Sequence, residues 1–225
     1  MGLLSDFYRS TLAKKAVMAV TGLMLFGFVL GHMIGNLKLY GGPAMLNHYA
    51  EGLREVGAPF FAHGQFLWVA RGGLIVAVLL HIWSAWSLTR ISHRARPQGY
   101  AVIRHQGSTY ASRTMRWGGV ILILFVVYHL LHLTFGSLHA DFQPADVYHN
   151  VVTGFANPLI SGFYILAQLA LGLHLYHGLW SLFQTIGWSG PRFNRLRQQF
   201  ALVFALVVSL ANISFPVAVL TGFVK

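Results

Sequence analysis

Apolar residues dominate five long stretches of the chain, and polar residues gather between them. A bilayer crossing by an α-helix requires about 20 mostly apolar residues. The pattern therefore predicts an all-α membrane protein, a five-transmembrane-helix bundle. Its 225 residues leave no room for a second domain. We expect a single transmembrane domain over residues 1–225, with spans at about 14–36, 65–90, 115–137, 158–187 and 200–223.

Basic residues lie mostly on one side of these five spans. Cytoplasmic loops of membrane proteins are enriched in Lys and Arg, so this side is predicted to be cytoplasmic, together with the N-terminus. The excess of basic residues behind the net charge of +11 is thus explained by the orientation of the chain in the membrane. It does not indicate binding to nucleic acid, and no nucleic acid is expected as a partner. The basic side carries Arg9, Lys14, Lys15, Arg90, Arg94, Arg96, Arg104, Arg113, Arg116, Arg192, Arg195 and Arg197, and the other side Lys38, Arg54, Arg71 and Lys225.

Composition excludes several classes of protein. Only 9% of the residues are charged, against roughly a quarter in soluble domains. The absence of cysteine excludes disulfides and cysteine-ligated iron–sulfur clusters within the chain. Residues 1–15 lack the features of a cleaved signal peptide, so the first span is expected to remain. Residues 47–55 suit an interfacial helix. The basic loop 91–114 suits either a topology signal or a docking surface for a cytoplasmic partner.

Six of the twelve histidines fall inside the predicted spans. Ionisable residues at that depth are costly and usually mark a site inside the bundle. The first and third spans place histidine in the outer half of the membrane, and the second and fourth place it in the inner half. The two depths differ by roughly 15 Å at 1.5 Å rise per residue. These residues are His32, His81, His129, His132, His174 and His177.

Two histidine pairs at two depths suit two b-type haems, because each iron takes two axial ligands from facing helices. Small residues beside a ligand leave space for the macrocycle, and they occur near His81 (Ala77, Ser84, Ala85) and His174 (Ala170, Gly178). Glycines 27, 31 and 35 suit either a macrocycle or close helix packing. Spacing alone leaves open which histidine of each doublet, 129/132 and 174/177, is the ligand, although the bulky Trp180 beside His177 favours His174.

The sequence around these histidines resembles the cytochrome b558 family, the membrane anchors of type B succinate:quinone oxidoreductases. The resemblance extends from about Phe7 to the last span. It implies a succinate dehydrogenase/fumarate reductase anchor with five helices and two haems. The segments that carry it are Gly27–Asn36, Leu79–His81, Phe125–His129, Asn157–Tyr164 and Leu173–Ser181.

The resemblance resolves both doublets. It implies that His81 and His174 hold the iron of the proximal haem, and that His32 and His129 hold the iron of the distal haem. It further implies an iron–sulfur subunit and a flavoprotein subunit on the cytoplasmic face, with FAD and the iron–sulfur clusters confined to these partners. Electrons would pass from succinate through both haems to menaquinone, in a bacterial cytoplasmic membrane, and the chain itself would not act on succinate. The whole complex can form an oligomer.

Quinone reduction consumes two protons, so a polar residue near the outer haem is expected to relay them. His48, Glu51 and Glu55 in the first outer loop are candidates, and ordinary solvated loop residues are the alternative. Arg90, Lys38 and Arg71 are candidates for neutralising haem propionates, with interfacial snorkelling as the alternative.

One position departs from some fumarate-reducing relatives. These carry a glutamate of a proton path two residues before the ligand of the fourth span, where this chain has Gly172. Succinate oxidation is thereby favoured over fumarate reduction. The rival classes are a cytochrome b of another quinone-linked dehydrogenase or of a hydrogenase, a histidine proton relay in a transporter, and an anchor that has lost one haem.

Overall fold

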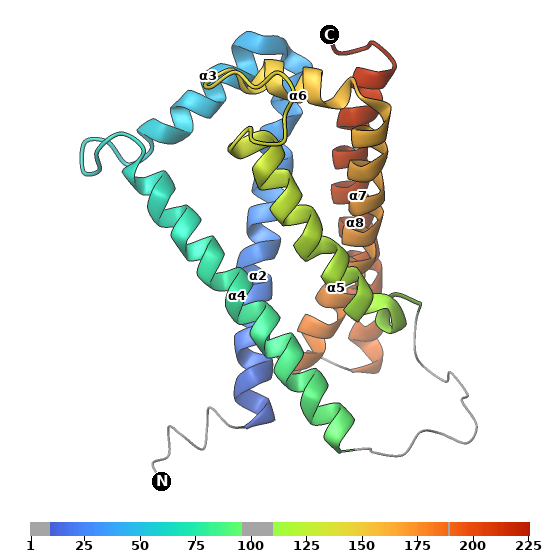
Figure 1. Cartoon of the computed structure of the whole chain (residues 1–225). Coiled ribbons are helices and arrows are strands. Elements are labelled where there is room, and N and C mark those ends of the chain that lie inside the picture. The colour runs from blue at the N-terminus through green and yellow to red at the C-terminus, as the bar shows by residue number, and fades with distance from the viewer. Residues whose placement is uncertain (1–9, 96–109, 189) are drawn as a thin grey trace.

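The computed structural model describes residues 10–95, 110–188 and 190–225, in which every regular element is a helix. Five helices are long and apolar enough to cross a membrane, which confirms the predicted all-α, five-span architecture. Helix α2 begins at one end of the bundle and α8 ends at the other (Figure 1), as an odd number of spans requires. The long helices are α2 (Thr11–Asn36), α4 (Gln65–Arg94), α5 (Tyr110–His129), α7 (Pro158–Thr185) and α8 (Pro191–Leu220).

The observed helices differ from the expected spans mainly at their polar ends. Helix α8 begins at Pro191, nine residues before the expected start at 200, because proline suits the first helical turn. Its first two turns are basic, so hydropathy alone missed them. Helix α5 is continued by a π-helical segment, η2 (Leu130–Thr134), in which the Phe135 N–H donates to the Leu130 carbonyl at 2.8 Å. The predicted features of residues 1–9 and 96–109, including the centre of the basic loop, lie outside the described residues.

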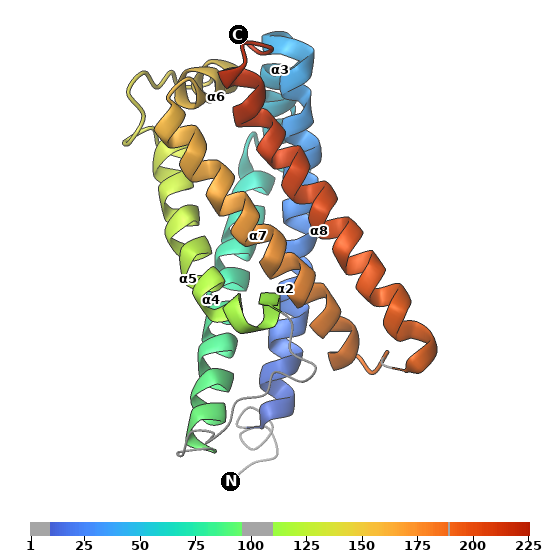
Figure 2. The ribbon, with the colours of Figure 1, turned by 90° about the vertical axis from the view of Figure 1, so that its right-hand side faces the viewer.

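Two short helices lie across one end of the bundle, which we call the capped end (Figures 1 and 2). Helix α3 (Gly42–Glu55) follows α2 through the 3-10 segment η1 (Leu37–Gly41), and it includes the expected interfacial helix 47–55. Helix α6 (Val147–Phe155) precedes α7 and was not anticipated. The C-terminus lies at the same end. We call the opposite end the N-terminal end.

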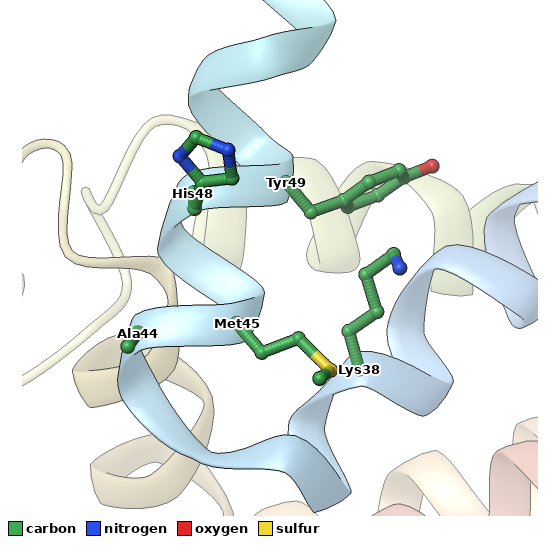
Figure 3. A pocket seen from close by; sticks show the side chains of 5 residues that line it. All are labelled: Lys38, Ala44, Met45, His48 and Tyr49. Atoms are coloured by element: carbon green, nitrogen blue, oxygen red, sulfur yellow. The ribbon is translucent and has the colours of Figure 1, made fainter.

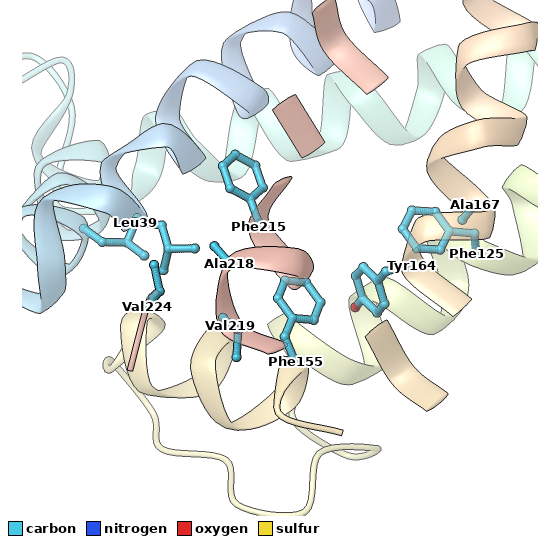
Figure 4. Packing of buried hydrophobic residues seen from close by; sticks show 10 residues of the cluster. Leu39, Phe125, Phe155, Tyr164, Ala167, Phe215, Ala218, Val219 and Val224 are labelled. Carbon is cyan, nitrogen blue, oxygen red and sulfur yellow. The ribbon is translucent and has the colours of Figure 1, made fainter. Parts of the chain in front are cut away.

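The main hydrophobic core lies beneath this cap and joins η1, α3, α5, α6, α7 and α8. Figure 4 shows Phe155 of α6 between Tyr164 of α7 and Val219 of α8. Helices α7 and α8 form the most extensive helix contact of the described chain. Helix α4 packs chiefly against α2, and α5 against α7, whereas few contacts join these two helix pairs.

The cap is held by a carboxylate that links α3 to α6. Asp146 is the N-cap of α6 and accepts hydrogen bonds from the His149 backbone N–H and the Asn47 side-chain amide, both at 2.9 Å. These bonds, the His149 N–H first, hold the pKa of Asp146 below its usual value. A lowered folded-state pKa means that the stabilisation is complete above the unfolded pKa. It is lost as the pH falls through the folded pKa.

We therefore expect Asp146→Ala to weaken the cap by about 1 kcal/mol, a typical value for removing an N-cap side chain. Hydrogen exchange of residues 147–155 measures this loss. On acidification the protection factors of the wild-type helix should fall as the Asp146 carboxylate is protonated. The variant has no carboxylate at this position, so its protection factors should not show this change. Equal protection of α6 in both proteins near neutral pH would contradict the assigned cap.

Candidate functional site

Near the capped end, His32 of α2 faces His129 of α5. Their ring centroids are 5.9 Å apart, and the ring planes are nearly perpendicular at 85°. Each ring stacks on a phenylalanine one turn earlier in its own helix, His32 on Phe28 and His129 on Phe125. The phenylalanines therefore restrict how far either imidazole can rotate.

A second pair lies deeper towards the N-terminal end, where His81 of α4 faces His174 of α7. Their ring centroids are 6.3 Å apart, with an interplanar angle of 60°. Each histidine lies 16 residues after the first residue of its helix, Gln65 and Pro158, and both helices start at the capped end. At 1.5 Å per residue this is about 24 Å along each helix. The two pairs thus occupy two depths.

Both pairs have a separation that suits a shared metal. An imidazole nitrogen lies about 2 Å from a bound transition metal, which puts two opposed rings roughly 6 Å apart between centroids. Within the part of the chain that the structure describes, Nδ1 of His174 is buried without a hydrogen-bond partner, and Gly27 and Gly31 of α2 have no atom within 4 Å of a built Cβ. A cavity of about 210 Å³ between α5 and α7 adjoins His174 and Ala170. These features fit a bis-histidine macrocycle at each depth.

The described residues contain no cluster of three or more His, Cys, Asp or Glu side chains that would hold a bare metal ion. The histidines of the spans are arranged as opposed pairs instead. An iron that already carries four ring nitrogens needs only the two ligands that such a pair offers.

Some of the small residues that the sequence associated with macrocycle space have another role in the structure. Ala77 and Ser84 are buried on α4, whose main neighbour is α2, so they allow these two helices to cross closely. On α2 itself, a Cβ at Gly35 would lie 2.7 Å from the Tyr49 ring. The glycine series of α2 therefore divides: Gly35 packs against α3, whereas Gly27 and Gly31 face open space.

The ring of His81 is oriented by Thr21 of α2, a buried residue. The Thr21 hydroxyl donates to the Val17 carbonyl at 2.7 Å, and its oxygen lies 3.2 Å from Nδ1 of His81. The hydroxyl oxygen can therefore accept the Nδ1–H, which leaves Nε2 free for a metal. Such outer hydrogen bonds fix the tautomer and orientation of metal-binding histidines. Gly22 leaves space for this ring, because a Cβ there would lie 3.4 Å from Cε1 of His81.

The other histidine of each doublet lies outside the facing pairs. His132 is fully buried in the π-helical segment, and its ring is stacked between Tyr128 and His139 at centroid distances of 5.4 and 4.9 Å. His177 lies 6.3 Å from the Trp180 ring. The structure thus brings together the four histidines predicted as ligands and places His132 and His177 elsewhere.

The three cations considered for haem propionates each lie over an aromatic ring near a helix end. The distances to the ring centroids are 4.7 Å for Arg90 on Trp86, 4.9 Å for Arg71 on Trp68, and 5.2 Å for Lys38 on Tyr49. This geometry is typical of cations held at a membrane interface.

A fourth cation, Arg197 of α8, was not considered from the sequence, which suggested only a topology signal. It is buried, its guanidinium lies 5.9 Å from the Trp180 ring, and its Nε and Nη1 have no hydrogen-bond partner among the described residues.

The residues predicted for a quinone site all lie on α3, but they do not converge. His48 lines a shallow depression of about 580 Å³, in which Met45 and Tyr49 extend towards Lys38 (Figure 3). Glu51 instead forms an exposed ion pair with Arg54 at 3.2 Å and a hydrogen bond with the His63 ring at 2.9 Å. Glu55 is exposed at the last residue of α3. Only His48 is therefore placed beside a depression.

Comparison with known proteins gave one family match. The model of the family described as "Succinate dehydrogenase/Fumarate reductase transmembrane subunit" matches residues 90–212, more than half of the chain. The matched region includes His129 and His174, whereas His32 and His81 precede it. No curated protein and no solved structure matches the chain. The chain belongs to the succinate dehydrogenase/fumarate reductase transmembrane subunit family.

Proposed function

We propose that the chain is the dihaem cytochrome b anchor of a succinate:quinone oxidoreductase. In this role it passes electrons from an iron–sulfur subunit through two haems b to menaquinone. The observation that carries the proposal is the pair of opposed histidine couples, His81/His174 and His32/His129, at two depths of a membrane protein of this family. A b-type haem supplies reversible one-electron transfer at its iron. The protein holds the two groups in line across the bundle and excludes water from them.

The N-terminal end is proposed to face the cytoplasm and to bind the iron–sulfur subunit, which in turn carries the flavoprotein. The helix ends at this side bring basic residues together, whereas the capped end carries all four acidic residues of the described chain, Glu51, Glu55, Asp141 and Asp146. The cytoplasmic membrane of a bacterium suits this arrangement, since basic ends remain on the cytoplasmic side. The basic residues are Lys14, Lys15, Arg90, Arg94, Arg113, Arg116, Arg192, Arg195 and Arg197.

The capped end is accordingly proposed to carry the quinone site, near the His32/His129 couple. His48 is the best-placed of the three sequence candidates, because it lines the depression that also contains the Lys38 chain and the Tyr49 ring. An imidazole at the rim can pass protons between solvent and a reduced quinone. Glu51 is engaged by Arg54 and His63, so we assign it to the stability of α3 instead.

Packing at Gly172 supports succinate oxidation as the physiological direction. A Cβ at this position would lie 2.5 Å from Oγ of Ser209 on α8. A side chain there would therefore have to displace the Ser209 hydroxyl or α8 itself, so this contact between α7 and α8 suits a residue without a side chain. The family match does not distinguish the two directions. It favours an anchor of a succinate dehydrogenase or fumarate reductase over a cytochrome b of a hydrogenase or of another dehydrogenase.

A pyridine haemochromogen assay on the purified native complex, combined with a redox titration, tests the proposal. We expect two haems b per copy of this chain, with at least one reduced by succinate. Absence of haem would overturn the dihaem assignment. The alternative, a proton relay formed by the histidines of the spans, would then be favoured. If two haems are found but succinate reduces neither, the dihaem cytochrome assignment would stand, and the proposed succinate-oxidising partner would be rejected.

A further inference from the structure

The capped-end couple is backed by a hydrogen-bond chain that ends outside the couple. The Tyr164 hydroxyl of α7 lies 3.3 Å from Nδ1 of His129 and 2.9 Å from Nδ1 of His132. Tyr164 is itself buried between the rings of Phe125 and Phe155, at centroid distances of 5.1 and 4.9 Å. Its hydroxyl therefore has only these two histidine nitrogens within hydrogen-bonding distance among the described residues.

The donor and acceptor roles in this hydrogen-bond chain follow from the single hydroxyl proton of Tyr164. A phenol has one O–H, so Tyr164 can donate to one ring nitrogen and must accept from the other. Donation to the closer partner, His132, leaves the tyrosine oxygen to accept the Nδ1–H of His129. His129 then presents an unprotonated Nε2, the nitrogen that a metal requires.

Packing holds the His132 ring with its Nδ1 towards the Tyr164 hydroxyl. Its ring is stacked between Tyr128 and His139, and a Cβ on Gly154 of α6 would lie 2.8 Å from its Cε1. His139 is fixed in turn: its Nδ1 accepts from the Asp141 N–H at 3.1 Å, and its Nε2 donates to the Asn150 carbonyl at 2.8 Å. The hydrogen-bond chain therefore ends at His132, whose Nε2 has no hydrogen-bond partner among the described residues, and stacking alone joins His132 to His139 and the cap. Such a chain is suited to orienting a ring rather than to conducting protons.

We propose that Tyr164 is the positioning residue of the outer haem ligand His129, with His132 as the acceptor that sets the direction of its hydroxyl. The inference rests on the proposed haem between His32 and His129. It gives a role to a buried histidine and a tyrosine that the ligand assignment leaves unused. A hydrogen bond to Nδ1–H makes the imidazole a more basic ligand, which favours the ferric form of a bound iron.

The test is Tyr164→Phe in the native complex, with potentiometric titration of both haems and low-temperature EPR of the ferric state. We expect two haems per chain, a distal midpoint potential shifted to a more positive value, and a changed largest g value for the same haem. The distal signals are those lost in His32→Ala. The matched control Tyr128→Phe removes a hydroxyl from the same aromatic cluster. No hydrogen bond of the Tyr128 hydroxyl occurs among the described residues, so neither haem should change.

A second comparison separates positioning from folding. His132→Gln keeps a hydrogen-bond acceptor, whereas His132→Leu removes it. The distal potential of His132→Gln should therefore lie closer to that of the wild type. Distal potentials and g values that are the same in wild type, Tyr164→Phe and His132→Leu would overturn the proposal. Wild-type protein without haem would instead reject the proposed function on which it rests. If Tyr164→Phe does not accumulate, the two His132 variants decide alone, and equal potentials overturn the proposal.

Discussion

Replacing His174 by alanine should remove the inner haem and leave the outer haem in place, which halves the haem content of the purified complex. The variant loses one of two axial ligands, while the other couple, His32 and His129, keeps both. Succinate should then fail to reduce the remaining haem at the wild-type rate, since the proposed route from the iron–sulfur subunit passes through the inner haem. His81→Ala should give the same result, because its ring faces His174 at 6.3 Å and is the other proposed ligand.

The matched control is His177→Ala, which removes an imidazole from the same helix one turn further on. His177 contacts Trp180 and does not face His81 in the structure, so this variant should retain two haems. Dithionite-reduced spectra and a haemochromogen assay give the haem content of each variant. A His177 variant with one haem, or a His174 variant with two, would show that the wrong histidine of the doublet has been assigned.

The fold could be predicted because its main determinant is the length and hydropathy of each segment. A run of about 20 apolar residues must satisfy its backbone hydrogen bonds internally in a membrane, and a helix does so. The same criterion missed α6 and the first two turns of α8, which lie outside the apolar runs. It also missed the π-helical turn after His129, since local hydrogen-bond register leaves no clear pattern in hydropathy.

The depths of the histidines within the spans could also be predicted, because depth follows from position along a helix. Their hydrogen-bond partners could not. Thr21 reaches His81 across 60 positions of the sequence, and Tyr164 reaches His129 across 35. Such contacts depend on how each helix is rotated about its own axis, and one sequence with weak amphipathicity does not define that rotation. The Phe-Tyr segment of α7 indicated the family, but the role of its tyrosine became visible only beside both histidines.

Gly172→Leu should destabilise the complex by about 1–3 kcal/mol, the usual cost of overpacking a close contact. Gly172 lies in the most extensive helix contact of the described chain, that between α7 and α8. A built Cβ lies 2.5 Å from Oγ and 3.4 Å from Cβ of Ser209, and 4.0 Å from the Ala205 carbonyl oxygen. A leucine must therefore displace the Ser209 hydroxyl and crowd α8. It should also displace His174, two residues further along the same helix, so haem content should fall together with the thermal transition temperature.

Gly162→Leu is the matched control, because Gly162 lies in the same helix but has no atom within 4 Å of a built Cβ. Both substitutions replace glycine with a better helix former, a gain of about 1 kcal/mol that cancels in the comparison. Any difference between the two variants therefore measures packing against α8. Equal transition temperatures would mean that α7 and α8 separate at little cost. In that case the close approach at Gly172 would no longer support the argument that this position suits a residue without a side chain, and fumarate reduction would regain equal standing as the direction of the enzyme.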